Sequence, residues 1–146
     1  MSEIKNIDIA AKIQFRAIEL INSSITTSLI NNENNSAFTF EIKTEVQLNQ
    51  ENKFIIVIIN VQILNEAKDF QLGSITTNNI YYVENYEEMV TLDSNGKVSI
   101  PESLVTTLNF ISISTTRGVM WNTFKGTHLH NAILPILDPK FTRKED

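Results

Sequence analysis

The two histidines of the chain, His128 and His130, are separated by one residue. On a β-strand this spacing would place both imidazoles on one face, as a bidentate metal site requires, and Asp138 could supply a third ligand. The sequence contains no cysteine, so the remaining ligands of such a site would have to be Asp or Glu. No motif in the sequence identifies which ones. We therefore expect two loop or surface histidines and no metal.

Other catalytic arrangements are no better marked. Glu41 and Glu45 could form an acid–base pair, but acids on a solvated strand face follow the same pattern. The run "TTRGV" at residues 115–119 is not the G-x-S-x-G elbow of serine hydrolases. No phosphate, dinucleotide or calcium motif is present, and the lack of cysteine excludes thiol catalysis and disulfides. The sequence predicts no catalytic residue and no cofactor, and hence a protein that is not an enzyme.

Composition and length narrow the class of protein further. The 146 residues fit one domain, which we expect to span residues 1–146. The net charge of −5, without any basic block, argues against nucleic acid as a partner. No run approaches the roughly 18 apolar residues of a membrane span, and the N-terminus lacks the apolar core of a secretory signal. We expect a cytoplasmic protein with no membrane insertion.

The clearest pattern lies in the middle of the chain. Apolar and polar residues alternate strictly from Ala37 to Leu48, which predicts an antiparallel strand with one wet face. The Asn-rich run 49–52 predicts a turn. The next segment, Lys53–Leu64, is apolar on both faces through Ile59, which predicts a central strand covered on both sides by other elements or by another subunit.

Two further strands are predicted around this hairpin. Residues 12–21 are rich in β-formers, and Asp69–Val83 predicts a strand with a bulge at Gly73. After it, "ENYEEM" (residues 84–89) suggests a helical turn, and Asp93–Lys97 a tight turn whose Asn-Gly step favours positive φ.

The signals change to those of a helix from Ser99 onward. Ser99 and Glu102 have the spacing of a capping box, with Pro101 in the first turn. Helical spacing of apolar residues then predicts about five turns that end within 121–126. The β-branched run "FISISTT" (residues 110–116) leaves a strand as the alternative.

The order of these elements defines the predicted fold. Four strands, a helix and an extended segment interrupted by Pro135 predict an α+β protein. We expect a four-stranded, meander-like antiparallel sheet with one long helix packed on one face. Apolar side chains gather near the helix end, where they form either core or an interface or groove for apolar ligands.

This pattern resembles the SecB family of export chaperones. The resemblance rests on the helix that carries "STTRG" (residues 114–118), the loop after it and an apolar "ILPI-D" segment around a proline. The opening run "AAKIQFRAIELINSSI" (residues 10–25) also resembles the first strand of that family, and the resemblance covers most of residues 10–141. The residues that correspond to the family's pattern are Thr116, Arg117, Gly118, Leu134, Pro135, Ile136, Leu137 and Asp138.

The resemblance implies an assembly and a function. The assembly is a homotetramer, a dimer of dimers whose sheets pair edge to edge with the helices packed between the dimers. The function is to hold unfolded polypeptides in apolar grooves without nucleotide. It implies that Arg117 anchors the helix end and that Gly118 allows close packing. The expected groove residues are Phe110, Met120, Trp121, Phe124, Ile133 and Leu134.

One departure from the family leaves the partner open. Family members carry a second helix and an acidic tail after the apolar segment, whereas this sequence ends at Asp146. Coupling to the SecA motor is therefore in doubt, and a SecB-like chaperone that serves a toxin–antitoxin pair is an alternative. Two hypotheses from different classes also stay open: a small-ligand protein or enzyme that uses His128 or His130, and a purely structural oligomerisation module.

Overall fold

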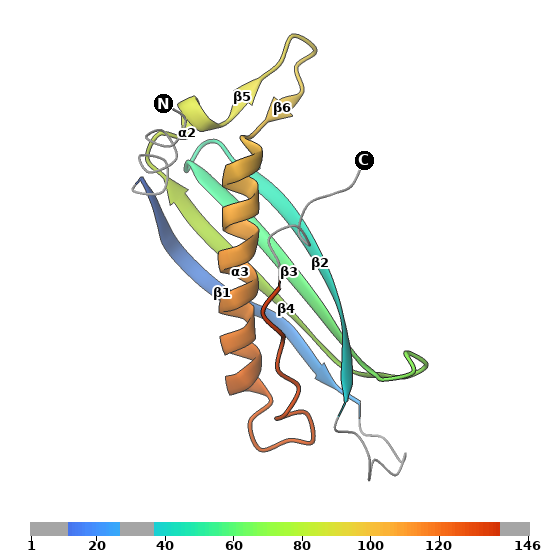
Figure 1. Ribbon diagram of the computed structural model, residues 1–146. Helices are drawn as coiled ribbons and strands as arrows, with labels where there is room; N and C mark the ends of the chain where they lie inside the picture. The colour runs from blue at the N-terminus through green and yellow to red at the C-terminus, as the bar shows by residue number, and fades with distance from the viewer. Residues whose placement is uncertain (1–11, 27–36, 138–146) are drawn as a thin grey trace.

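The computed structural model describes residues 12–26 and 37–137, and shows a twisted antiparallel sheet with one long helix lying across one of its faces (Figure 1). This is the predicted α+β arrangement. The main strands are β1 (Ile13–Ile25), β2 (Phe38–Asn49), β3 (Phe54–Asn65) and β4 (Gln71–Val83). They are followed by α2 (Tyr86–Met89), the short strands β5 (Thr91–Leu92) and β6 (Val98–Ser99), and α3 (Glu102–Thr123).

The strand order of the large sheet is β1-β4-β3-β2. The three strands β2, β3 and β4 form a meander, whereas β1 pairs with β4 rather than with its neighbour in sequence. The pairing of β1 runs from Ile13 opposite Val83 to Ile25 opposite Gly73. β1 and β2 are therefore the two edge strands.

The predicted bulge at Gly73 is confirmed. Ile63 lies opposite Gly73, but the next pair joins Leu64 to Gln71, so that Leu72 is the extra residue. A Cβ atom at Gly73 would lie 2.6 Å from the side chain of Leu129 and 2.7 Å from the backbone carbonyl oxygen of Ser24. Only glycine fits where the end of the sheet meets the segment that follows α3.

The predicted central strand is β3, and its two faces differ in burial. Every second side chain, from Ile55 to Ile63, is at most 1% exposed and belongs to the core under α3. The alternate residues, such as Ile56 and Ile58, are only half-buried on the opposite face. The helix α3 thus covers one face of β3, as predicted. Cover of the opposite face by another subunit stays a prediction.

The long helix differs from its prediction at its start. Ser99 pairs with Thr91 in the β5–β6 hairpin, so it cannot cap α3, and the predicted capping box is wrong. The N-cap is Pro101, whose carbonyl accepts the backbone N–H groups of Leu104 and Val105. The β-branched run 110–116 is helical, which excludes the strand alternative. No helix in the described part of the chain is long and apolar enough to cross a membrane.

A chain of hydrogen bonds explains why Ser and Thr occupy the buried face of α3. Thr116 Oγ1 donates to the carbonyl of Ser112 at 2.7 Å, so its hydroxyl must accept from Thr77 Oγ1, which lies 2.8 Å away on β4. Thr77 in turn accepts from Asn79 Nδ2 at 3.2 Å. Beside this chain, the hydroxyl of Tyr81 lies 2.7 Å from that of Ser112. These bonds tie α3 to β4 through the centre of the core.

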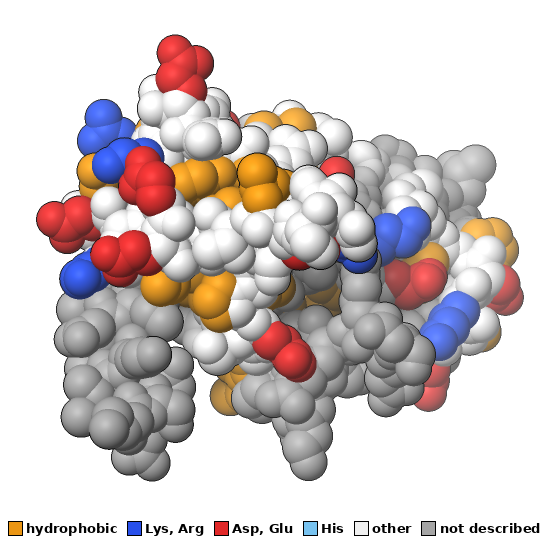
Figure 2. Space-filling model, turned by 90° about the horizontal axis from the view of Figure 1, so that it is seen from above, with side chains coloured by type: hydrophobic (Ala, Val, Ile, Leu, Met, Phe, Trp, Pro, Cys, Tyr) orange, Lys and Arg blue, Asp and Glu red, His pale blue; other side chains and the backbone are white. Residues whose placement is uncertain are grey.

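The β5–β6 hairpin projects from the end of the sheet where α3 begins (Figure 1). Its turn, predicted at Asp93–Lys97, is confirmed. Asp93 Oδ1 accepts the N–H groups of Asn95 and Lys97, both at 2.8 Å, and Gly96 has φ +77°. Seen from this end, apolar side chains form patches beside acidic ones (Figure 2).

Candidate binding surface around the long helix

The segment after α3 folds back along the helix and is held by Arg117. We call residues 129–137 the strap. Leu129 and Leu134 are at most 1% exposed and fill the core, although the strap has no regular secondary structure from residue 132 to 137. Arg117 Nε donates to the carbonyl of Leu134 at 2.7 Å, and Arg117 Nη2 donates to that of Pro135 at 2.8 Å. The fixed fork of the guanidinium suits two successive carbonyls.

These contacts change the role expected of Arg117. Arg117 lies well before Thr123, the last residue of α3, so it anchors the strap rather than the helix end. Gly118 is exposed, and a Cβ atom there would meet nothing within 4 Å. The close-packing role expected of Gly118 stays a prediction, and within this chain the close approach occurs at Gly73.

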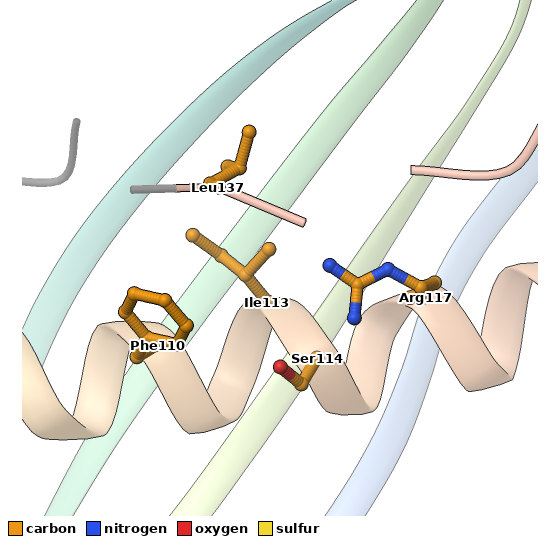
Figure 3. A pocket seen from close by; sticks show the side chains of 5 residues that line it. All are labelled: Phe110, Ile113, Ser114, Arg117 and Leu137. Atoms are coloured by element: carbon orange, nitrogen blue, oxygen red, sulfur yellow. The ribbon is translucent and has the colours of Figure 1, made fainter. Parts of the chain in front are cut away.

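A small pocket lies between α3 and the strap (Figure 3). Ile113 points toward Leu137, and the Arg117 guanidinium reaches across to the strap beside them. The space is about 10 Å³, which is room for about one water molecule. The pocket is therefore too small for a substrate. Its lining residues are Phe110, Ile113, Ser114, Arg117 and Leu137.

The six expected groove residues differ widely in exposure. Met120, Phe124 and Leu134 are each 1% exposed and belong to the core, so a client cannot reach them in this conformation. Trp121 and Ile133 are about half exposed, at 52% and 50%. Phe110, beside the small pocket, is half-buried. Whether any of the six contacts a client stays a prediction.

The exposed members of this group lie near the Arg117 contact. Trp121 follows Arg117 by four residues, so the two share a side of the helix, and Ile133 precedes the strap carbonyls that Arg117 holds. Ile136, which is 88% exposed, extends the same segment. We call Phe110, Trp121, Ile133 and Ile136 the strap surface. Ile136 is not among the expected groove residues, although it belongs to the apolar segment on which the family resemblance rests.

The histidines do not form the arrangement considered from their spacing. They lie in the turns that follow α3, His130 within the first residues of the strap, rather than on a strand, and both are exposed. His130 Nδ1 lies 3.0 Å from the carbonyl of Thr127, to which it can only donate. Among the described residues, no three His, Asp or Glu side chains come together as metal ligands, and Asp138 lies outside them.

A second apolar surface runs along the edge strand β1. Phe15, Ile18 and Leu20 are between 44% and 48% exposed. They pair with β4 residues whose side chains are buried against α3, so they share the helix-covered face of the sheet. The ring of Phe15 stacks at 4.6 Å on that of Tyr81. We call these three residues the β1 surface. The sequence predicted a strand here but not its exposure.

The described chain is thus an α+β protein whose candidate functional features are apolar surfaces rather than a cluster of reactive side chains. No protein-family model matches its sequence, and no curated protein matches it. Among solved structures it is similar to the SecB-like chaperone Rv1957 of Mycobacterium tuberculosis, in complex with a ChAD peptide from the antitoxin HigA1 (Rv1956). The TM-score is 0.58 at 16% identity, over 90% of this chain and 92% of that one. The protein therefore has a SecB-like fold.

Proposed function

We propose that this protein is an ATP-independent chaperone that holds unfolded polypeptides against its apolar surfaces. The observation that carries the proposal is the strap surface, where Trp121 and Ile133 remain half exposed beside a segment pinned by Arg117. Large aromatic and aliphatic side chains on a fixed frame can bind varied sequences, because apolar contact is not directional. The fold supports this, since the similar Rv1957 structure carries a bound peptide.

The proposal includes assembly into a homotetramer, a dimer of dimers. The β1 surface supports it, since its three large apolar side chains are about half exposed and lie on an edge strand. Pairing of two β1 strands from different subunits would give hydrogen-bond partners to the backbone groups at the open edge. It would also bury these side chains together. The helices would then face one another between two dimers.

The partner proposed first is a generic unfolded chain in the cytoplasm. The peptide bound to Rv1957 comes from an antitoxin, which favours the toxin–antitoxin alternative for this chain as well. Delivery of clients to the SecA motor is the other branch of the proposal. The two branches differ in the partner that releases the client, and both begin with the same binding step.

The test is size-exclusion chromatography with light scattering, run with and without a permanently unfolded protein. We expect a tetramer that co-elutes with the unfolded protein and ignores its folded form. Trp121→Ser and Ile133→Ser should weaken co-elution, whereas Phe70→Ser should not. Phe70 is a matched control because it is 50% exposed, lies just before β4 and is not part of the strap surface.

Two results would contradict the proposal. A wild-type protein that does not bind the unfolded chain is not a holdase. Binding that all three serine variants retain equally would remove the strap surface from the mechanism. A stable tetramer that binds no client would instead support the third hypothesis from the sequence, a purely structural oligomerisation module.

A further inference from the structure

A larger cleft lies at the other end of α3, between the β5–β6 hairpin and the turn that joins β2 to β3. Its volume is about 550 Å³, within the range of ordinary ligand clefts. Trp121 is 19 residues beyond Glu102, so it lies roughly 28 Å from the start of the helix, along its axis. The cleft is lined by Leu48, Gln50, Tyr86, Glu87, Val90, Thr91, Leu92 and Val98.

The hairpin presents apolar side chains that the chain itself leaves uncovered. Leu92 is 70% exposed and Val98 is 46% exposed, and the two face each other as a cross-strand pair. Both line the cleft. β5 and β6 are the two strands of a separate small sheet, so each has an outer edge along which an extended peptide can add as a third strand.

Glu87 is the charged residue that lines the cleft, and the segments around it carry more acidic than basic residues. Glu87 pairs with Lys53 at 3.8 Å, but this pair is solvent-exposed and therefore weak. The region seen from the end in Figure 2 has apolar side chains with both acidic and basic ones beside them. The acidic residues in the β2–β3 turn and in 84–102 are Glu51, Glu84, Glu87, Glu88, Asp93 and Glu102, and the basic ones are Lys53 and Lys97.

The acidic charge around the cleft favours one of the molecules that could bind there over the others. A second copy of the chain would bring an equally acidic hairpin, and like charges oppose such a contact. Residues 1–11 carry Glu3 and Asp8 against one base, Lys5, so they lack the complementary charge as well. A peptide with apolar side chains at alternate positions, flanked by lysine or arginine, matches both the apolar floor and the acidic rim.

We propose that the cleft between the hairpin and the β2–β3 turn docks a basic, apolar segment of a partner protein in extended form. Leu92 and Val98 contact its apolar side chains, and Glu87 and Glu88 face its basic ones. The inference does not rest on the proposed chaperone function, because it uses different residues at the opposite end of α3.

The test uses the full chain and a fluorescent peptide of about eight residues in which lysine alternates with leucine. Anisotropy titrations measure its affinity for the wild type, Leu92→Ser, Val98→Ser and Glu87→Lys. We expect each substitution to weaken binding about tenfold, since each removes a buried apolar contact or reverses a charge. Phe70→Ser changes an apolar residue that is about as exposed as Val98 but lies outside the cleft, and it should leave the affinity unchanged.

A second peptide with glutamate in place of lysine distinguishes charge from general stickiness. We expect it to bind the wild type weakly, and to bind Glu87→Lys better than the wild type. Equal affinity for the two peptides, no binding of the lysine peptide, or full binding by Leu92→Ser would each overturn the proposal. A fall in the mass from light scattering on Leu92→Ser would assign the cleft to a second copy and overturn it too.

Discussion

The hydroxyl oxygens of Thr77 and Thr116 lie 2.8 Å apart in the core and join β4 directly to α3. Both residues are fully buried. The bond is directional, because the single hydroxyl proton of Thr116 is already given to the carbonyl of Ser112. The long helix is thus attached to the sheet through a polar contact in the midst of an apolar core, and this makes its contribution measurable.

Substitution of Thr116 by valine should destabilise the fold by about 1–2 kcal/mol, because it leaves the buried hydroxyl of Thr77 without its acceptor. Urea unfolding of Thr77→Val, Thr116→Val and the double variant would measure the coupling, which we expect to be about 1 kcal/mol. Thr107→Val is the control, since Thr107 also bonds back to its own helix, at Ser103, but is exposed. Strictly additive single variants would contradict the prediction.

Substitution of Arg117 by alanine should release the strap, because two carbonyls lose a charged donor. Hydrogen bonds to charged groups contribute about 1.5–3 kcal/mol each, and partial exposure lowers that, so we expect a loss of about 2 kcal/mol. Hydrogen exchange should become faster in residues 132–137 and remain unchanged in β3. Lysine at position 117 should rescue only in part, since it lacks the planar fork. Unchanged exchange in Arg117→Ala would show that burial alone holds the strap.

Two glycine-to-alanine substitutions should change the free energy of unfolding in opposite directions. At Gly73 a methyl group would lie 2.7 Å from the carbonyl oxygen of Ser24, which is backbone and cannot move aside, so we expect a loss of about 1–3 kcal/mol. At Gly118, exposed within α3, alanine should add about 0.5–1 kcal/mol through helix propensity. Denaturant midpoints of the two variants give the comparison. A neutral Gly73→Ala would mean that β1 shifts to accommodate the methyl group.

The stability of the fold should fall in alkaline solution through Tyr81. Burial raises the pKa of Tyr81 to about 12, against a smaller lowering by its hydrogen bond to Ser112. Because the folded-state pKa lies above the unfolded value of 10.0, this contribution is complete below pH 10 and is lost as the pH rises toward 12. Tyr81→Phe should reduce the slope of stability against pH in this window without abolishing it, since burial also raises the pKa of Tyr86.

Ser112→Ala provides a second check on the same group. Removal of the hydroxyl partner takes away the interaction that lowers the pKa of Tyr81, so the pKa should rise further. Ultraviolet difference spectroscopy of tyrosinate formation follows this titration in the folded protein. A lower pKa in Ser112→Ala would show that the loosened site has admitted water.

Several elements of the fold could be predicted because their signals are local. β2 follows from strict alternation, and the Asp93–Lys97 turn follows from a side chain that bonds to its own loop. The bulge at Gly73 was also predictable from a glycine inside a strand pattern. These features depend on neighbours a few residues away, which the sequence shows directly.

The errors arise where distant segments compete for the same residue. Ser99 has the spacing of a cap, but its pairing with Thr91 places it in a strand. Arg117 is expected at the helix end, because nothing in the sequence shows that the strap carbonyls return to it. Likewise, Met120 and Trp121 are adjacent apolar residues, and only the packing of α3 decides that the first is buried and the second exposed.

The sequence by itself determined the class of fold, the number of main strands, the long helix and the lack of a marked catalytic motif. Hydrophobic periodicity, turn-forming residues and composition act over short distances along the chain. They do not depend on contacts with residues far away in sequence. Only the tertiary structure decided that β1 lies beside β4, that Gly73 is the close-packed glycine, and which apolar side chains stay exposed. Each of those depends on contacts between residues far apart in sequence, and many different contacts satisfy the same local pattern.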